Sequence, residues 1–182
     1  MSFFAERPRA SQLRQWHLEM RAAVDDHELK MLDLIAQHLP VPVAILGMTP
    51  EELTVHFEDT RRELDAAASL LVLAEAEAVL RVDYISRVQR KGKDAVSRAY
   101  RELHKEKEIS VRLDQDILAT WVTYHGECRS AVSEFRAVLN LRHWLAHGRY
   151  WTPKLGRVYA PQDVFEIAAR LFAKLPEVTG WI

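Results

Sequence analysis

Apolar residues recur along most of the chain at intervals of three or four, and glycine and proline fall between these stretches. This spacing predicts amphipathic helices, because residues three and four apart share one face of a helix. The first helix is expected over residues 11–38, where Pro40 and Pro42 end it. Its predicted apolar face carries Leu13, Trp16, Met20, Val24, Met31 and Ile35.

A second helix is expected to start at Thr49. The Thr49 hydroxyl can cap the first turn, Pro50 suits the first helical position, and the acids Glu51 and Glu52 face the positive end of the helix dipole. The link before it, residues 43–48, is short and apolar, which is compatible with an extended conformation.

The second helical pattern is long, because it continues to about Arg90. A bend is therefore expected near Thr60. Residues 66–73 are apolar apart from one serine, so we expect them to be buried. Residues 91–94 then interrupt the pattern, with Asp94 as the candidate cap of the next helix.

Shorter helices are expected over residues 95–106, 112–124 and 128–147, and Gly148 is a natural left-handed stop after the last of these. A final helix is predicted from Pro161 to a point before Pro176, preceded by a brief extended piece at 157–159. Together these patterns predict one all-α domain over residues 1–182, an antiparallel helical bundle with short extra helices, on which the helix 11–38 packs.

Composition agrees with a globular protein: of 182 residues, 48% are hydrophobic and 28% charged. The single cysteine, Cys128, excludes an internal disulfide and a four-cysteine zinc site, and we expect it to be inert. Charge and proline precede any apolar run at the start of the chain, so no signal peptide is expected, and no apolar run is long enough to span a membrane. A cytoplasmic location is predicted.

The net charge of -1 argues against a polycation that coats nucleic acid. Sequence motifs of phosphate-binding loops, serine hydrolases and zinc proteases are absent. One local constellation remains, Arg142-His143-Trp144-Leu145-Ala146-His147, near the end of a predicted helix. Histidine suits proton transfer near neutral pH, and arginine binds phosphate through a charged fork, so this group fits phosphodiester chemistry.

The constellation resembles the Arg-x(4–6)-His motif of the HEPN superfamily, the higher eukaryote and prokaryote nucleotide-binding domains. In that family the residue after the arginine is usually polar, and here it is His143. Apolar flanking residues, Gly148 and a predicted terminal helix also agree with the family pattern. The resemblance covers residues 132–176, whereas the upstream part agrees only in being helical.

The resemblance implies a metal-independent endoribonuclease that needs no cofactor and leaves a 2′,3′-cyclic phosphate. It implies a homodimer with a shared cleft, and a role in toxin–antitoxin or antiviral defence with an antitoxin or defence-system partner. On this interpretation Arg142 binds the scissile phosphate, His147 is the base or acid, and His143 assists.

Some members of the family use an acidic residue on an earlier helix, and Glu77 with Arg81 lies on one helical stripe upstream. Glu77 is expected either to orient the arginine of the motif or only to pair with Arg81 within its helix. Arg149, Tyr150 and Lys154 are candidate RNA- or phosphate-binding residues. Some toxins of the family are modified on a tyrosine two positions after the histidine, where this chain has Arg149.

Spacing alone does not identify the motif, because Arg98 and His104, among other pairs, also fit it. A second signal is the interval between Glu134 and Asp163, which contains no acid. Its cations predict a local cationic surface such as a phosphate backbone requires. They are Arg136, Arg142, Arg149, Lys154 and Arg157.

Other interpretations remain open at this stage. Arg142 and His147 are also suited to capping the end of a helix, and His143 with His147 has the spacing of a metal pair, although no metal is expected. Trp144 suits either packing or base stacking. A HEPN-like module that binds nucleotide, RNA or protein without catalysis, or a purely structural bundle, would carry the same residues.

Overall fold

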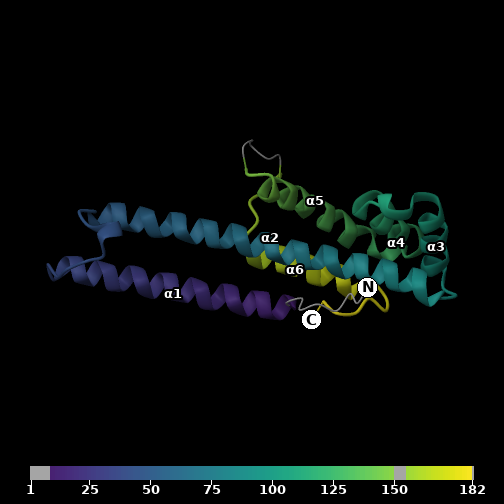
Figure 1. Cartoon of the computed structure of the whole chain (residues 1–182), viewed down its shortest axis with the longest axis horizontal. Helices are drawn as coiled ribbons and strands as arrows, with labels where there is room; N and C mark the ends of the chain where they lie inside the picture. The colour runs from purple at the N-terminus through teal and green to yellow at the C-terminus, as the bar shows by residue number, and fades with distance from the viewer. Residues whose placement is uncertain (1–8, 150–154, 182) are drawn as a thin grey trace.

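The computed structural model describes residues 9–149 and 155–181. Two long helices run side by side, α1 (Ala10–Ala36) and α2 (Pro50–Arg90), and shorter helices gather around the second half of α2 (Figure 1). No strand occurs in these residues, so the predicted all-α helical bundle is confirmed. The shorter α-helices are α3 (Ala95–Lys107), α4 (Ala119–Tyr124), α5 (Arg129–Ala146) and α6 (Pro161–Ala173).

The starts of α2 and α3 are fixed by local capping, as predicted. The Thr49 hydroxyl accepts a hydrogen bond from the Glu52 backbone N–H at 3.2 Å, and the Glu52 carboxylate accepts one from the Thr49 N–H at 2.8 Å. Asp94 accepts a hydrogen bond from the Ser97 N–H at 2.9 Å. These bonds satisfy N–H groups that the first turn of a helix cannot pair internally.

The distal half of the α1–α2 pair forms an arm, residues 21–62, that projects from the rest of the molecule (Figure 1). A small apolar core near its tip consists of Met31, Ile45, Leu53 and Phe57. Ion pairs hold the two helices together farther along, where Arg61 meets Asp25 at 2.6 Å and also contacts Glu28. At the base of the arm both His17 and Arg21 contact Asp65, at 2.7 and 3.1 Å.

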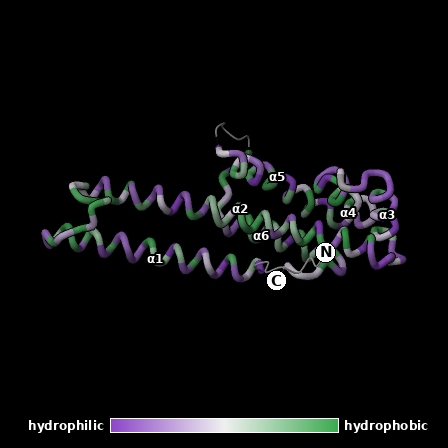
Figure 2. The backbone as a smooth tube through the Cα atoms, in the orientation of Figure 1, coloured by the Kyte–Doolittle hydropathy of each residue, from purple (hydrophilic) through white to green (hydrophobic). Residues whose placement is uncertain are grey.

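The larger core fills the body, where the second half of α2 packs against α3, α5 and α6. Figure 2 shows hydrophobic and hydrophilic positions alternating along the helices, as amphipathic packing requires. α1 runs along α2 and reaches α6 near its own start, where Arg14 lies 5.2 Å from the Phe165 ring centroid. The largest fully buried side chains include Trp121, Tyr100, Phe135, Leu73, Leu80 and Ile117.

Several local predictions are wrong. α2 continues without a break through Thr60, and it looks straight in Figure 1. The 43–48 link contains a 3-10 turn, Val43–Ile45. Residues 157–159 form neither a helix nor a paired strand, so the extended piece expected there stays a prediction. The 112–124 helix begins as a π-helix, Leu113–Leu118, before α4 continues it.

The predicted apolar faces are only partly buried. Within residues 66–73, Leu71 is 42% exposed, whereas Ala68, Val72 and Leu73 are buried. On α1, Leu13 and Met31 are buried, whereas Trp16 and Met20 are 36% and 39% exposed. Among the described helices, none combines the length and apolar character needed to cross a membrane.

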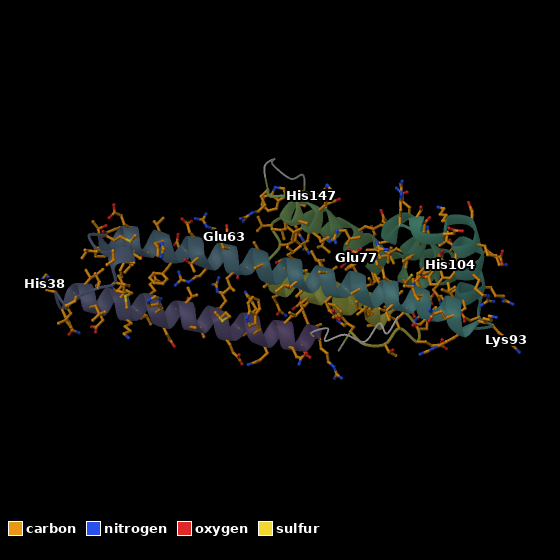
Figure 3. The ribbon with its side chains drawn as sticks, viewed as in Figure 1. His38, Glu63, Glu77, Lys93, His104 and His147 are labelled. Carbon is orange, nitrogen blue, oxygen red and sulfur yellow. The ribbon has the colours of Figure 1, made fainter. Side chains whose placement is uncertain are left out.

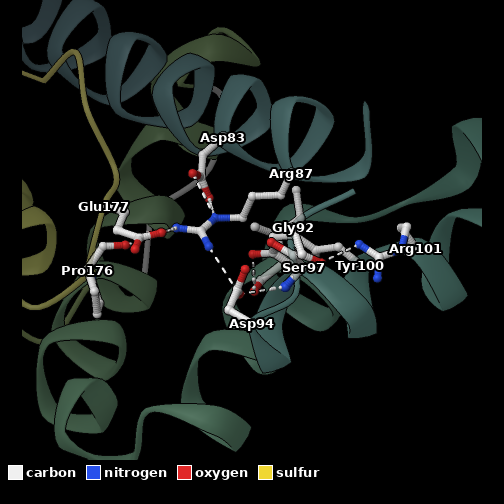
Figure 4. A network of polar contacts seen from close by, with 10 residues as sticks. Asp83, Arg87, Gly92, Asp94, Ser97, Tyr100, Arg101, Pro176 and Glu177 are labelled. Carbon is white, nitrogen blue, oxygen red and sulfur yellow. Dashed lines mark hydrogen bonds and ion pairs between the residues drawn. The ribbon is translucent and has the colours of Figure 1, made fainter. Parts of the chain in front are cut away.

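Arg87 joins three parts of the body from an almost buried position (Figure 4). Its guanidinium donates to Asp83 at 2.9 Å, to Asp94 at 3.3 Å and to the Pro176 carbonyl at 2.9 Å. It also lies 4.9 Å from the Trp121 ring centroid. These contacts bury a charged side chain in the body by surrounding it with polar partners.

Candidate functional site

The end of α5 places the motif histidines on the surface. The last residue of α5 is Ala146, and His147 caps the helix end. Gly148 follows with a φ of +81°, the left-handed conformation that glycine adopts without strain. The His147 N–H still donates to the His143 carbonyl at 3.1 Å, and the Arg149 N–H donates to the Trp144 carbonyl at 3.2 Å. The imidazole of His147 is therefore attached to an ordered backbone.

His143 and His147 form a close pair. Their ring centroids are 4.3 Å apart and the rings are inclined by 54°. Both residues are exposed. In residues 9–149 and 155–181, no group of three or more metal-ligating side chains surrounds this pair or lies elsewhere.

Arg142 reaches across to α2, where it meets Glu77. The Arg142 Nη2 and Glu77 Oε2 atoms are 2.9 Å apart, and the side chains are 38% and 15% exposed. Glu77 also accepts a hydrogen bond from Arg81 Nε at 2.8 Å. Both expected roles of Glu77, the pair within its helix and the contact with the arginine of the motif, thus occur together.

This contact brings two distant segments of the sequence together at the end of α5. Figure 3 labels Glu77 on α2 and His147 at the end of α5. Arg142 Nε is buried and makes no hydrogen bond with the described residues, so Glu77 is the carboxylate that positions this guanidinium. A guanidinium held at one edge keeps its remaining N–H groups for an oxyanion.

Arg149 is paired elsewhere along α2. Its two Nη atoms donate to the two Glu63 carboxylate oxygens at 2.8 and 2.7 Å, and this hydrogen bonding lowers the pKa of the Glu63 carboxyl. Glu63 and Glu77 are about 21 Å apart along the helix axis, at 1.5 Å per residue. The structure therefore does not bring Arg149 to the phosphate site of Arg142. Tyr150 and Lys154, the other candidate phosphate-binding residues, lie outside the described residues.

The interval without acids is partly neutralised by acids from other segments. Arg142 meets Glu77, Arg149 meets Glu63, and Arg136 meets Asp114. Arg157 instead lies 4.7 Å from the ring centroid of Tyr159. Counting charges along the sequence could not detect these partners. The sequence contained one indication that acids of α2 could meet these arginines. Glu63 and Glu77 are four helical turns apart and therefore lie on nearly the same face of α2.

A cleft that the sequence did not predict lies on the other flank of α5. It has a volume of about 1110 Å³ between α2, α5 and the segment that leads into α6. Trp144 lines it, and this partly buried ring also packs against the core. Three arginines, Arg62, Arg149 and Arg157, face three acids, Asp59, Glu63 and Asp65, in its walls.

The expected inertness of Cys128 agrees with its position. The thiol is fully buried, and burial raises its pKa. Compared with known proteins, the chain matches no protein-family model, no curated protein and no solved structure. The geometry of the site is therefore the ground on which a function can be argued.

Proposed function

We propose that this protein is a metal-independent endoribonuclease of the HEPN type. The observation that carries the proposal is the ion pair that holds Arg142 against Glu77, at the same end of α5 that presents two exposed, closely spaced imidazoles. A fixed guanidinium next to a proton-transfer group is what cleavage of an RNA phosphodiester requires. Capping of a helix end alone would not explain a carboxylate on α2 that orients the arginine.

In the proposed reaction, the 2′-oxygen of the RNA attacks the adjacent phosphorus and the bond from phosphorus to the 5′-oxygen breaks. A neutral histidine takes the 2′-hydroxyl proton, and a protonated histidine gives a proton to the leaving oxygen. Arg142 stabilises the negative charge on the phosphorane. The products are a 2′,3′-cyclic phosphate and a free 5′-hydroxyl, without any redox change.

We propose further that the complete site is shared by two copies of the chain. In-line attack places the base and the acid on opposite sides of phosphorus. His143 and His147 lie one turn apart on one stripe of α5, so both approach from the same side. A second copy related by a two-fold axis would supply His147 from the opposite side.

The resemblance also supports a biological role for this reaction. HEPN ribonucleases often act as toxins or in antiviral defence, so we propose that the substrate is cellular or viral RNA in the cytoplasm. An antitoxin or another component of a defence system would then control the enzyme.

The decisive experiment is cleavage of end-labelled RNA by the purified protein in EDTA. We expect the wild type to produce fragments with cyclic phosphate ends. His147→Ala is expected to slow cleavage on the order of 10²–10⁴-fold, the usual contribution of a general acid or base. Arg142→Ala should reduce it to a similar degree, since charge stabilisation is worth as much.

The matched controls are Arg98→Ala and His104→Ala, because this pair has motif-like spacing on a different helix. Both should cleave at the wild-type rate. Equal cleavage by wild type, Arg142→Ala and His147→Ala would refute the proposal, and loss of activity in EDTA would point to a metal site instead. RNA binding without cleavage would indicate the non-catalytic module.

The shared site makes a separate prediction. If two copies complete it, specific activity should fall as the protein is diluted below the dimer dissociation constant. Sedimentation at the same concentrations should show dimer giving way to monomer. Constant specific activity across that transition would show that one chain is sufficient.

A further inference from the structure

Three segments meet along one side of α5 and bring four arginines together. Arg81 on α2 donates from Nη1 to the Val111 carbonyl at 3.5 Å. Arg136 on α5 donates from Nη2 to the Asp114 carbonyl at 3.1 Å and also contacts the Asp114 carboxylate. Arg112 lies between Val111 and Asp114 in the sequence, and its Nη1 donates to Gln115 Oε1 at 2.9 Å. With Arg142 they form what we call the arginine strip, which consists of Arg81, Arg112, Arg136 and Arg142.

The arginine strip carries more positive charge than its partners neutralise. Two carboxylates, Glu77 and Asp114, form ion pairs with its side chains, and a third, Asp116, accepts a hydrogen bond from the Arg112 backbone N–H at 2.7 Å. The side chains of Arg81, Arg136 and Arg142 are 44%, 38% and 38% exposed.

Arg136 and Arg142 are each held at one edge, whereas Arg81 is held through Nε by Glu77 and through Nη1 by the Val111 carbonyl. Among the described residues, no hydrogen bond is made by Nη2 of Arg81, Nη1 of Arg136 or Nη1 of Arg142. The remaining N–H groups are thus available to an anion from solvent.

One member of the arginine strip, Arg136, lies on the same stripe of α5 as the motif histidines. Arg136, Asn140, His143 and His147 are separated by four, three and four residues, so they lie on one stripe of α5. From Arg136 to His147 the stripe is about 16 Å long at 1.5 Å per residue. At about 3.4 Å per stacked nucleotide, that length corresponds to roughly five nucleotides.

We propose that a single-stranded RNA lies along this stripe, with its phosphates on the arginine strip and its scissile bond at the histidines. The proposal rests on the proposed ribonuclease function and assigns Arg112 and Arg136 as substrate-binding residues. Guanidiniums held by a carboxylate at one edge bind phosphate with the other. The opposite flank of α5 is less suitable, because the cleft there balances its arginines with acids.

The test compares a 20-nucleotide RNA with a dinucleotide substrate in EDTA, using wild type and the double variant Arg112→Gln/Arg136→Gln. Glutamine keeps hydrogen-bonding capacity and removes the charge. We expect the double variant to bind the long RNA at least tenfold more weakly. Its loss in cleavage should be at least tenfold larger for the long RNA than for the dinucleotide.

The salt dependence gives a second readout that a merely structural effect would not change. The slope of log affinity against log salt should be smaller by about 0.7 for each phosphate that the variant no longer binds. Arg98→Gln and Arg170→Gln serve as controls. Arg170 pairs with Glu134 as Arg136 pairs with Asp114, but it lies on α6. Both controls should match the wild type.

Wild-type affinity and salt slope in the double variant would overturn the proposal, as would equal losses for the two substrates. If the double variant keeps RNA affinity but no longer binds an acidic peptide such as polyglutamate, the arginine strip serves a protein partner and the proposal is wrong. If the wild type cleaves neither substrate, the ribonuclease function fails. In that case RNA binding alone tests the proposal for the arginine strip, and absence of RNA binding overturns this proposal as well.

Discussion

Single charged residues in this protein are positioned by partners that are distant in the sequence. Glu77, whose side chain is 15% exposed, lies between Arg81 and Arg142. A carboxylate between two guanidiniums offsets their mutual repulsion as well as orienting them. Without its charge, the two arginines would face each other across α2 and α5, and Arg142 would leave the position in which Glu77 holds it.

Glu77→Gln is therefore expected to slow RNA cleavage by tenfold or more. The physical reason is that a neutral amide holds Arg142 weakly and no longer neutralises Arg81. Cleavage rates are measured together with thermal melting, to separate positioning from unfolding. Glu134→Gln is the matched control, because it removes a similar ion pair between α5 and α6. Equal rates for the two variants would contradict the role of Glu77.

The Asp83 carboxyl lies almost buried in the body beside Arg87, and its pKa is raised. Burial raises its pKa from the ordinary value of 3.8 to about 6, and the neighbouring carboxylates Asp94 and Glu177 act in the same direction, while Arg87 opposes them. Between these two values the folded state binds more protons than the unfolded state. Ionisation of Asp83 therefore destabilises the folded protein as the pH rises from about 4 to 6.

Asp83→Asn should remove this destabilisation of the folded state, because an amide does not ionise. Relative to the wild type, its free energy of unfolding is expected to increase as the pH rises through that window, by up to about 3 kcal/mol. Urea unfolding of both proteins at pH 4, 5, 6 and 7 measures the difference, which cancels the contributions of other carboxyl groups. A difference that is constant with pH, or that changes in the opposite direction, would contradict the expectation.

At the scale of elements, α2 and α3 each begin directly after a residue that caps the first turn. Asp94 has two functions there, because it caps α3 through the Ser97 N–H and pairs with Arg87 at 3.3 Å. Arg87 also donates a hydrogen bond to the Pro176 carbonyl, which links this pair to the chain segment after α6. One residue thus both starts a helix and helps to fix its position in the body.

Asp94→Ala is expected to lower the free energy of unfolding by about 2 kcal/mol, since it removes both the cap and the charge. Asp94→Ser should lower it by about half as much, because serine retains the cap, which is worth about 1 kcal/mol. Chemical denaturation of the two variants and the wild type measures both values. Equal destabilisation by serine and alanine would show that the cap contributes nothing.

Helix boundaries were predictable because the signals that set them are local. The caps at Thr49 and Asp94 and the stop at Gly148 each involve residues within one turn. The π-helix Leu113–Leu118 was not predictable in this way, because its pattern of apolar residues also fits an α-helix.

The candidate site was predictable only as far as its residues are close in sequence. The grouping of Arg142 with His147 came from their spacing, and Glu77 was a candidate partner. The pairing of Arg149 with Glu63 and the contact of Arg136 with Asp114 depend on how helices far apart in the sequence are packed. Burial of Arg87 against Trp121 was unpredictable for the same reason, since its neighbours in sequence are charged.

On the scale of the whole molecule, the protein has two apolar cores of very different size. In the body α2 packs against α3, α5 and α6, whereas the arm consists of two helices with a small core at Met31, Ile45, Leu53 and Phe57. Each helix of the arm is covered on one side by its partner and faces solvent on the other. Less apolar surface is buried per residue there, so the arm is expected to open locally before the body unfolds.

Amide hydrogen exchange should show this difference directly. Backbone amides of the arm are expected to exchange faster than those around Leu73 and Leu80 in α2. Phe57→Ala should increase exchange within the arm and leave the body protected, because the two cores share no buried residue. Phe135→Ala, in the large core, is the comparison and should reduce protection of the body. Uniform exchange along α2 would contradict the division.

The unbroken α2 also fixes the distance between the tip of the arm and Arg142. From Glu77 to Pro50 it extends over 27 residues, or about 40 Å at 1.5 Å per residue. A molecule that touches the tip of the arm is held at about that distance from Arg142, and it cannot reach the imidazoles unless it is itself long enough. For an RNA strand stacked at about 3.4 Å per nucleotide, the minimum length that touches both is about twelve nucleotides.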